Sequence, residues 1–79
     1  MPHFYFHICN GHGFLEDEEG VDLSDEAAAR KQAVEAARDV MTGDLREGRL
    51  DLTSFIEVED ENHVLLFTLT FAEAVEIRR

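Results

Sequence analysis

Residues 3–15 read HFYFHICNGHGFL, and this stretch decides how the chain begins to fold. Side chains alternate in character along its first seven residues, as they do along a β-strand with two different faces. The set on one face is Phe4, Phe6 and Ile8, and the set on the other face is His3, Tyr5, His7 and Cys9. Aromatic and β-branched residues favour the extended backbone, so we expect a strand here.

The dipeptide Asn10-Gly11 follows this strand and is a preferred pair for a two-residue hairpin turn. We therefore expect a second strand over residues 12–15. In that register Cys9 lies opposite His12, and His7 lies opposite Phe14. Beyond the polar stretch 16–20, the segment Val21–Leu23 is predicted to be short and extended.

A long helix is predicted from Ser24, which we expect as its N-cap, to a stop at Gly48. Its expected apolar face comprises Ala29, Ala33, Ala36, Ala37, Val40 and Met41, with Val34 and Leu45 at the margin. The opposite face comprises Lys31, Glu35, Arg38, Asp39 and Arg46. Because alanine lets two backbones approach closely, the apolar face indicates a helix lying on a sheet.

A second hairpin is predicted after the helix, with strands 55–59 and 64–70 around a polar turn. Ile56 and Val58 are expected to point inward. The run 64–67 (VLLF) is apolar on both faces, which indicates an inner strand. Residues 71–77 (FAEAVEI) have helical spacing and predict a short closing helix.

The expected fold is therefore α+β, a single domain over residues 1–79. Two hairpins (ββαββ) form one antiparallel sheet, with one Ala-rich helix on one face and a short C-terminal helix. A single helix leaves the other face of a four-stranded sheet uncovered, so we expect a homodimer. The candidate interface residues are Tyr5, Phe55, Val64 and Leu66.

Charge excludes several classes of partner. The formal net charge is -11, distributed as -7 over residues 1–26, +1 over residues 27–50 and -5 over residues 51–79. No basic stripe is available for phosphates, so neither nucleic acid nor an anionic membrane is expected as a partner. No apolar run approaches the ~20 residues of a membrane span, and the N-terminus lacks the features of a signal peptide. A lone cysteine cannot form an internal disulfide, and we expect a cytoplasmic protein.

His7, Cys9 and His12 are the candidate metal ligands, because they could converge across the hairpin. A structural zinc site needs four ligands, commonly from two closely spaced pairs, and this set has only three. Acidic surroundings raise the pKa of a thiol, which argues against Cys9 as a nucleophile. The acidic stretch 16–20 lacks the spacing of an EF-hand loop. We therefore predict no metal, no cofactor and no catalytic residue.

The order of several short motifs resembles a family of small bacterial proteins of unknown function, common in rhizobia and other alphaproteobacteria. The motifs are Tyr5-Phe6-His7, Gly11-x-Gly13, Asp17-x-Glu19-Gly20-x-x-Leu23, the Ala-rich helix, Ile56-Glu57-Val58-x-Asp60 and Phe71-x-x-Ala74-Val75. The family typically carries a basic or polar residue where this chain has Cys9. The resemblance implies the fold and brings no activity with it.

Residues 17–20 and the helix are also similar to the N-terminal domain of HicB-type antitoxins. That resemblance implies an acidic module that binds a small basic protein. Our leading interpretation is a non-enzymatic cytoplasmic interaction or regulatory domain that associates with itself. The alternatives are the antitoxin-like binder and a metal-dependent enzyme that uses His7 and His12.

Overall fold

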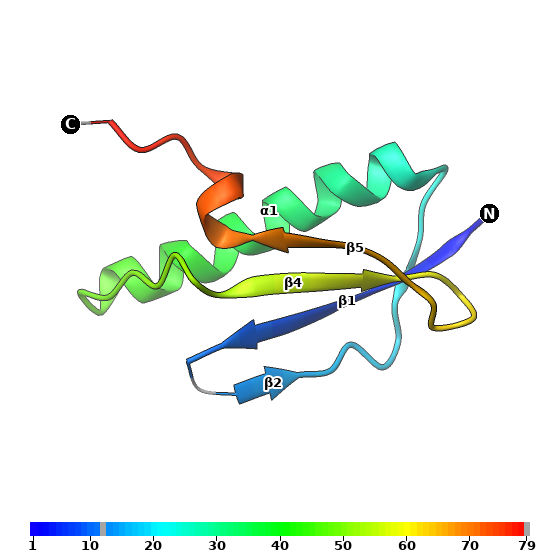
Figure 1. Cartoon of the computed structure of the whole chain (residues 1–79), viewed down its shortest axis with the longest axis horizontal. Coiled ribbons are helices and arrows are strands. Elements are labelled where there is room, and N and C mark those ends of the chain that lie inside the picture. Colours follow the sequence, from blue (N-terminus) through cyan, green and yellow to red (C-terminus); the bar gives the residue numbers. More distant parts are fainter. Residues whose placement is uncertain (12, 79) are drawn as a thin grey trace.

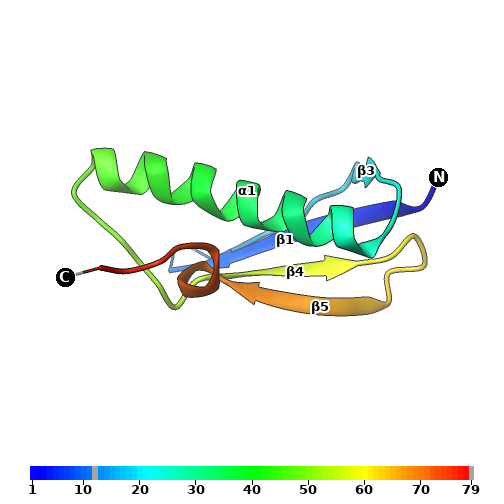
Figure 2. The same cartoon turned by 90° about the horizontal axis from the view of Figure 1, so that it is seen from above.

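The computed structural model describes residues 1–11 and 13–78 and has the expected α+β architecture. Its strands are β1 (His3–Asn10), β2 (Gly13–Leu15), β3 (Val21–Asp22), β4 (Phe55–Glu59) and β5 (Leu65–Thr70). The helix α1 (Glu26–Arg46) connects β3 to β4, and the 3-10 helix η1 (Phe71–Ala74) follows β5. Figure 1 shows the sheet with α1 running along it, and Figure 2 shows that the helix covers one side only.

The two hairpins join through their first strands, which gives the strand order β2-β1-β4-β5 with β3 beside β1. All the pairings are antiparallel. Phe6 pairs with Val58 and Ile8 with Ile56, so these apolar residues share the side of the sheet that faces α1. Of these, Ile56 and Val58 are fully buried, as expected from the sequence.

The expected register of the first hairpin is wrong by two residues. Cys9 lies opposite Phe14 and Asn10 opposite Gly13, so the first strand pairs one residue further than expected and the second strand begins one residue later. Gly13 has a φ of +127°, which only glycine adopts readily, and this backbone lets the second strand begin there. A shift of two residues leaves every side chain on its expected face. His12, expected opposite Cys9, lies outside the described residues.

The prediction of an inner strand at residues 64–67 is also wrong, because β5 lies at the edge of the sheet. Val64 and Leu65 are 56% and 51% exposed. Val58 pairs with Phe67 and Glu59 with Leu65, so a bulge leaves Leu66 as an extra residue in β5. A bulge breaks the alternation of side chains, which explains the apolar run without a second buried face.

The helix packs on the sheet through Ala29, Ala33, Ala37 and Met41, which are its buried residues. The N-cap is Asp25 rather than the expected Ser24, and its Oδ1 accepts a hydrogen bond from the Ala28 N–H at 2.8 Å. A carboxylate cap also interacts favourably with the positive end of the helix dipole. Gly48 stops the helix as expected, with a φ of +81°. Leu45, placed at the margin of the apolar face, is 57% exposed.

The closing helix is shorter than expected and ends at Ala74. Thr70 and Glu73 form a capping box at its start, and Val75 then returns to extended backbone. Phe71 and Ala74 are buried against the core. The Arg38 Nε–H donates to the Ala74 carbonyl at 2.8 Å, which ties the end of η1 to the helix.

Candidate functional site: the open face of the sheet

The side of the sheet turned away from α1 is called the open face (Figure 2). The register places on it Tyr5, His7 and Cys9 of β1, Phe14 of β2, Phe55, Glu57 and Glu59 of β4, and Thr68 of β5. Titratable side chains from three separate segments meet there. The open face is therefore the candidate site for chemistry or recognition.

His7 is the most buried polar side chain of the open face, at 4% exposure. Its Nε2 lies 2.8 Å from Oε1 of Glu59, and its Nδ1 lies 3.0 Å from the backbone N of Asp17. A backbone N–H can only donate, so Nδ1 must accept and the ring proton must sit on Nε2. His7 is therefore a neutral imidazole that links β1, the loop after β2 and β4.

Glu59 also contacts a second imidazole, that of His63 in the turn between β4 and β5. Its Oε1 lies 3.2 Å from Nδ1 of His63, whose ring stacks on Tyr5 at a centroid distance of 4.4 Å. The hydrogen bond from His7, and next that from His63, hold the pKa of Glu59 below its usual value. His63 has a φ of +61°, which is uncommon for residues other than glycine.

β2 and β3 pair with the two ends of β1 and leave its middle without a strand partner on that side. Asp17 supplies a hydrogen-bond acceptor there. Its carboxylate accepts the N–H groups of Phe6 and Gly20, both at 3.0 Å. At Gly20 the φ is +67°, and an added Cβ would lie 2.6 Å from the Phe4 carbonyl oxygen. The Asp17-x-x-Gly20 motif therefore shapes the loop that holds His7. In the sequence, the spacing of Asp17 and Gly20 is the signal for this loop.

His3 differs from His7 in its charge. Its Nδ1 lies 2.6 Å from Oδ1 of Asp22, and its Nε2 lies 2.7 Å from the Glu19 carbonyl oxygen. Both partners are acceptors, so both ring nitrogens donate and the ring is an imidazolium. The bond to Asp22, and next that to the Glu19 carbonyl, raise the pKa of His3. Two histidines of one strand thus differ in charge, His3 being positive and His7 neutral.

Cys9 faces a carboxylate. Its Sγ lies 3.7 Å from Oε1 of Glu57. Burial, and next the Glu57 charge, raise the pKa of this thiol. A raised pKa leaves little thiolate near neutral pH, so the site does not activate Cys9 as a nucleophile.

The candidate metal ligands do not assemble within the described residues. His7 has both nitrogens engaged and turns toward Glu59, while Cys9 meets Glu57. In residues 1–11 and 13–78 no group of three or more His, Cys, Asp or Glu side chains is arranged so that it could hold a metal ion. The third candidate, His12, lies outside this part of the chain.

The four candidate interface residues fall into two places. Tyr5 and Phe55 are half-buried on the open face. Val64 lies exposed just before β5, and Leu66 is the half-buried extra residue of the bulge. The structure therefore puts two of them on a sheet face and two at a sheet edge.

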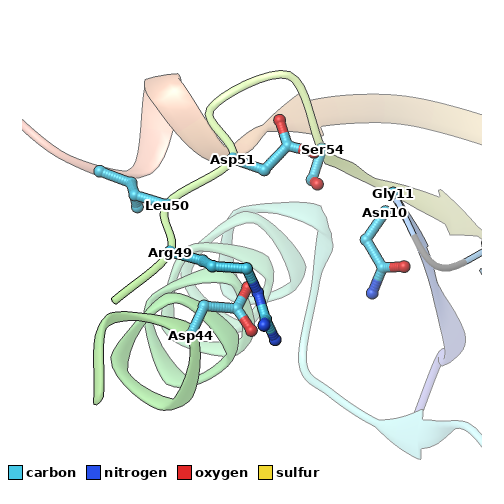
Figure 3. Close-up of a pocket in the computed structure, with 7 residues that line it drawn as sticks. All are labelled: Asn10, Gly11, Asp44, Arg49, Leu50, Asp51 and Ser54. Atoms are coloured by element: carbon cyan, nitrogen blue, oxygen red, sulfur yellow. The ribbon is translucent and has the colours of Figure 1, made fainter. Parts of the chain in front are cut away.

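A hollow of about 370 Å³ lies at the other end of the sheet, where the first hairpin, the end of α1 and the following loop meet (Figure 3). Its lining residues are Asn10, Gly11, Asp44, Arg49, Leu50, Asp51 and Ser54. Hydrogen bonds from the Thr53 hydroxyl and backbone hold the pKa of Asp51 below its usual value. Two carboxylates, of Asp44 and Asp51, and the guanidinium of Arg49 lie among the lining residues.

The chain belongs to a family described as a domain of unknown function (DUF6894), whose model matches residues 3–72. The match confirms the resemblance to a family without an assigned activity, and it shows no link to HicB-type antitoxins or to a bacterial group. Searches of curated proteins and of solved structures find no match to the chain. In the described residues no helix has the length and apolar character needed to span a membrane.

Proposed function

We propose that this member of a family without an assigned activity is a non-enzymatic interaction domain that works as a homodimer. The two copies pair through the outer edges of their β5 strands. One observation carries the proposal: β5 (LLFTLT) is a six-residue edge strand with no charged residue, in a chain of net charge -11.

Edge strands in monomeric proteins usually carry a device that prevents pairing, such as a lysine or a proline. β5 has neither, although it contains the bulge at Leu66, and its outer edge pairs with no other strand in the described residues. Leu65 and the adjacent Val64 are more than half exposed at its start. The far end is blocked, because the Thr70 N–H donates to Oε1 of Glu73.

Antiparallel pairing of two β5 strands produces a two-fold dimer with one continuous sheet and both helices on the same side. The start of β5 in one copy then meets the end of β5 in the other. Asp60 and Glu61 lie near the start, and Glu73 lies near the end. Like charges approach at both ends, so added salt strengthens the dimer.

The groups on the open face support a role without catalysis. His7 has both ring nitrogens engaged in hydrogen bonds, and the pKa of the Cys9 thiol is raised. A metal-dependent enzyme that uses His7 must first break one of those two bonds. We also propose a cytoplasmic location, since a reducing compartment suits a lone cysteine.

The test compares the same substitution on the two edge strands. Leu65→Lys adds a charge to the edge at β5, and Leu15→Lys adds one to the opposite edge at β2, where Leu15 is 64% exposed. Light scattering at micromolar concentration should give twice the mass of the 9.0 kDa chain for the wild type and for Leu15→Lys. Leu65→Lys should reduce it to one chain.

Circular dichroism checks that both variants remain folded. A wild-type mass of one chain at both low and high salt contradicts the proposal. Loss of the dimer in Leu15→Lys alone would place the contact at the wrong edge and also reject it.

A further inference from the structure

We infer that the open face binds an arginine-bearing segment of a second protein, with Glu57 as the central contact. The inference rests on the proposal that this chain is an interaction domain, and it names the partner. It does not depend on pairing through β5, because each single chain has a complete open face.

The basic residues are confined to two parts of the chain, and the strands carry acidic residues without them. All seven Lys and Arg residues lie within positions 30–49 or at positions 78 and 79, so no strand carries one. The remaining positions hold fourteen of the eighteen acidic residues. Arg30 lies over the Phe67 ring at 4.2 Å, and Arg38 donates a hydrogen bond to the Ala74 carbonyl. These two cations of α1 therefore make their contacts on the helix side of the sheet.

Glu57 lies at the middle of the open face, with His7 opposite on β1 and Thr68 opposite on β5. Glu57 is half-buried, and the one hydrogen bond that its carboxylate accepts from the described residues comes from the Cys9 thiol at 3.7 Å. A thiol is a weak donor, so this carboxylate keeps an unneutralised charge in the centre of the sheet. A cationic side chain supplies the stronger, charge-assisted hydrogen bond that Glu57 lacks.

Glu59 shows what a neutralised carboxylate looks like on the same strand. It accepts from both His7 and His63 at 2.8 and 3.2 Å. Two acids two residues apart thus differ: one is engaged by the protein, and the other is open to a partner. The difference selects Glu57 as the contact.

Aromatic rings on the same face as Glu57 favour arginine over lysine. Phe55 lies on the same face two residues before Glu57, and Phe14 lies opposite Cys9 and is 57% exposed. A planar guanidinium stacks on such rings while it bonds a carboxylate, whereas an ammonium group acts only as a point charge. A second copy of the open face repeats Glu57 and is repelled, as are nucleic acids and anionic lipids.

The test measures fluorescence anisotropy of a labelled octapeptide of alternating Arg and Thr as the full chain is added. Glu57→Gln and Glu35→Gln each remove one negative charge, and Glu35 is exposed on α1, which covers the other side of the sheet. We expect Glu57→Gln to weaken binding about tenfold and Glu35→Gln by less than about twofold. The peptide with Lys in place of Arg should bind several-fold more weakly.

NMR amide shifts locate the contact, and we expect them at Cys9, Glu57 and Thr68 rather than along α1. Equal weakening by both variants means diffuse attraction to an acidic protein and overturns the inference, as does no binding by the wild type. Equal affinity for the Arg and Lys peptides overturns the choice of arginine. Binding that persists in the Leu65→Lys variant supports the inference even if dimerisation fails.

Discussion

Replacement of His7 by phenylalanine tests whether the buried imidazole holds the open face together. The phenyl ring keeps the shape of the side chain and its place between Tyr5 and Phe14, whose ring centroids lie 6.4 and 5.5 Å away. It removes both hydrogen bonds of His7. The Asp17 N–H loses its acceptor, and Glu59 keeps only His63.

The magnitude follows from those two losses. An unsatisfied buried N–H costs about 1–3 kcal/mol, and one lost hydrogen bond whose acceptor keeps another donor costs about 1 kcal/mol. Greater burial of apolar area by the phenyl ring returns about 1 kcal/mol. The expected net loss is about 1–3 kcal/mol, a large part of the roughly 4–12 kcal/mol typical of a domain of this length.

Thermal unfolding followed by circular dichroism at pH 7 measures this loss. For a domain of this size, about 1 kcal/mol corresponds to a Tm shift of about 4–8 °C, so His7→Phe should lower Tm by about 5–20 °C. Tyr5→Phe is the matched control on the same face. Its hydroxyl makes no hydrogen bond to the described residues, so we expect a change within about 0.5 kcal/mol. A His7→Phe variant that melts within about 2 °C of the wild type would refute the argument.

Three further predictions concern the helix, the acid limit of stability and the thiol. Ala33→Leu should lower the free energy of unfolding by about 1–3 kcal/mol, because Ala33 is fully buried against the sheet. Lys31 is exposed, so Lys31→Ala should change the free energy of unfolding by less than about 0.5 kcal/mol. Similar denaturation midpoints for the two variants would contradict this packing. The folded-state pKa of Glu59 is lowered below its usual 4.5, so its contribution is present above about pH 4.5 and is lost as the pH falls through the folded value. Glu59→Gln should therefore flatten the acid side of the stability–pH curve, and an unchanged acid slope would count against the His7–Glu59–His63 cluster. Cys9 should react with iodoacetamide at pH 8 more slowly than glutathione does, because its pKa is raised, and a faster reaction would contradict the environment described for the thiol.

Local physics in the sequence determined the elements of this protein and the faces of most of its residues. The period of two in residues 3–9 and in residues 55–59 predicted the two central strands, and the Ala stripe predicted the buried face of α1. These signals are readable because each depends on neighbours two to four positions apart along the chain. The stop at Gly48 was equally local, because its φ of +81° suits glycine.

Only the tertiary structure decided the contacts between residues far apart in the sequence. His7 and Glu59 are 52 positions apart, and no periodicity relates them. The same applies to Asp17, whose carboxylate completes the edge of β1, and to the bulge that gives β5 its apolar run. Strand order, bulges and side-chain partners depend on which segments meet in three dimensions, so the charge states of His3 and His7 and the exposed edge of β5 emerge only once the chain has folded.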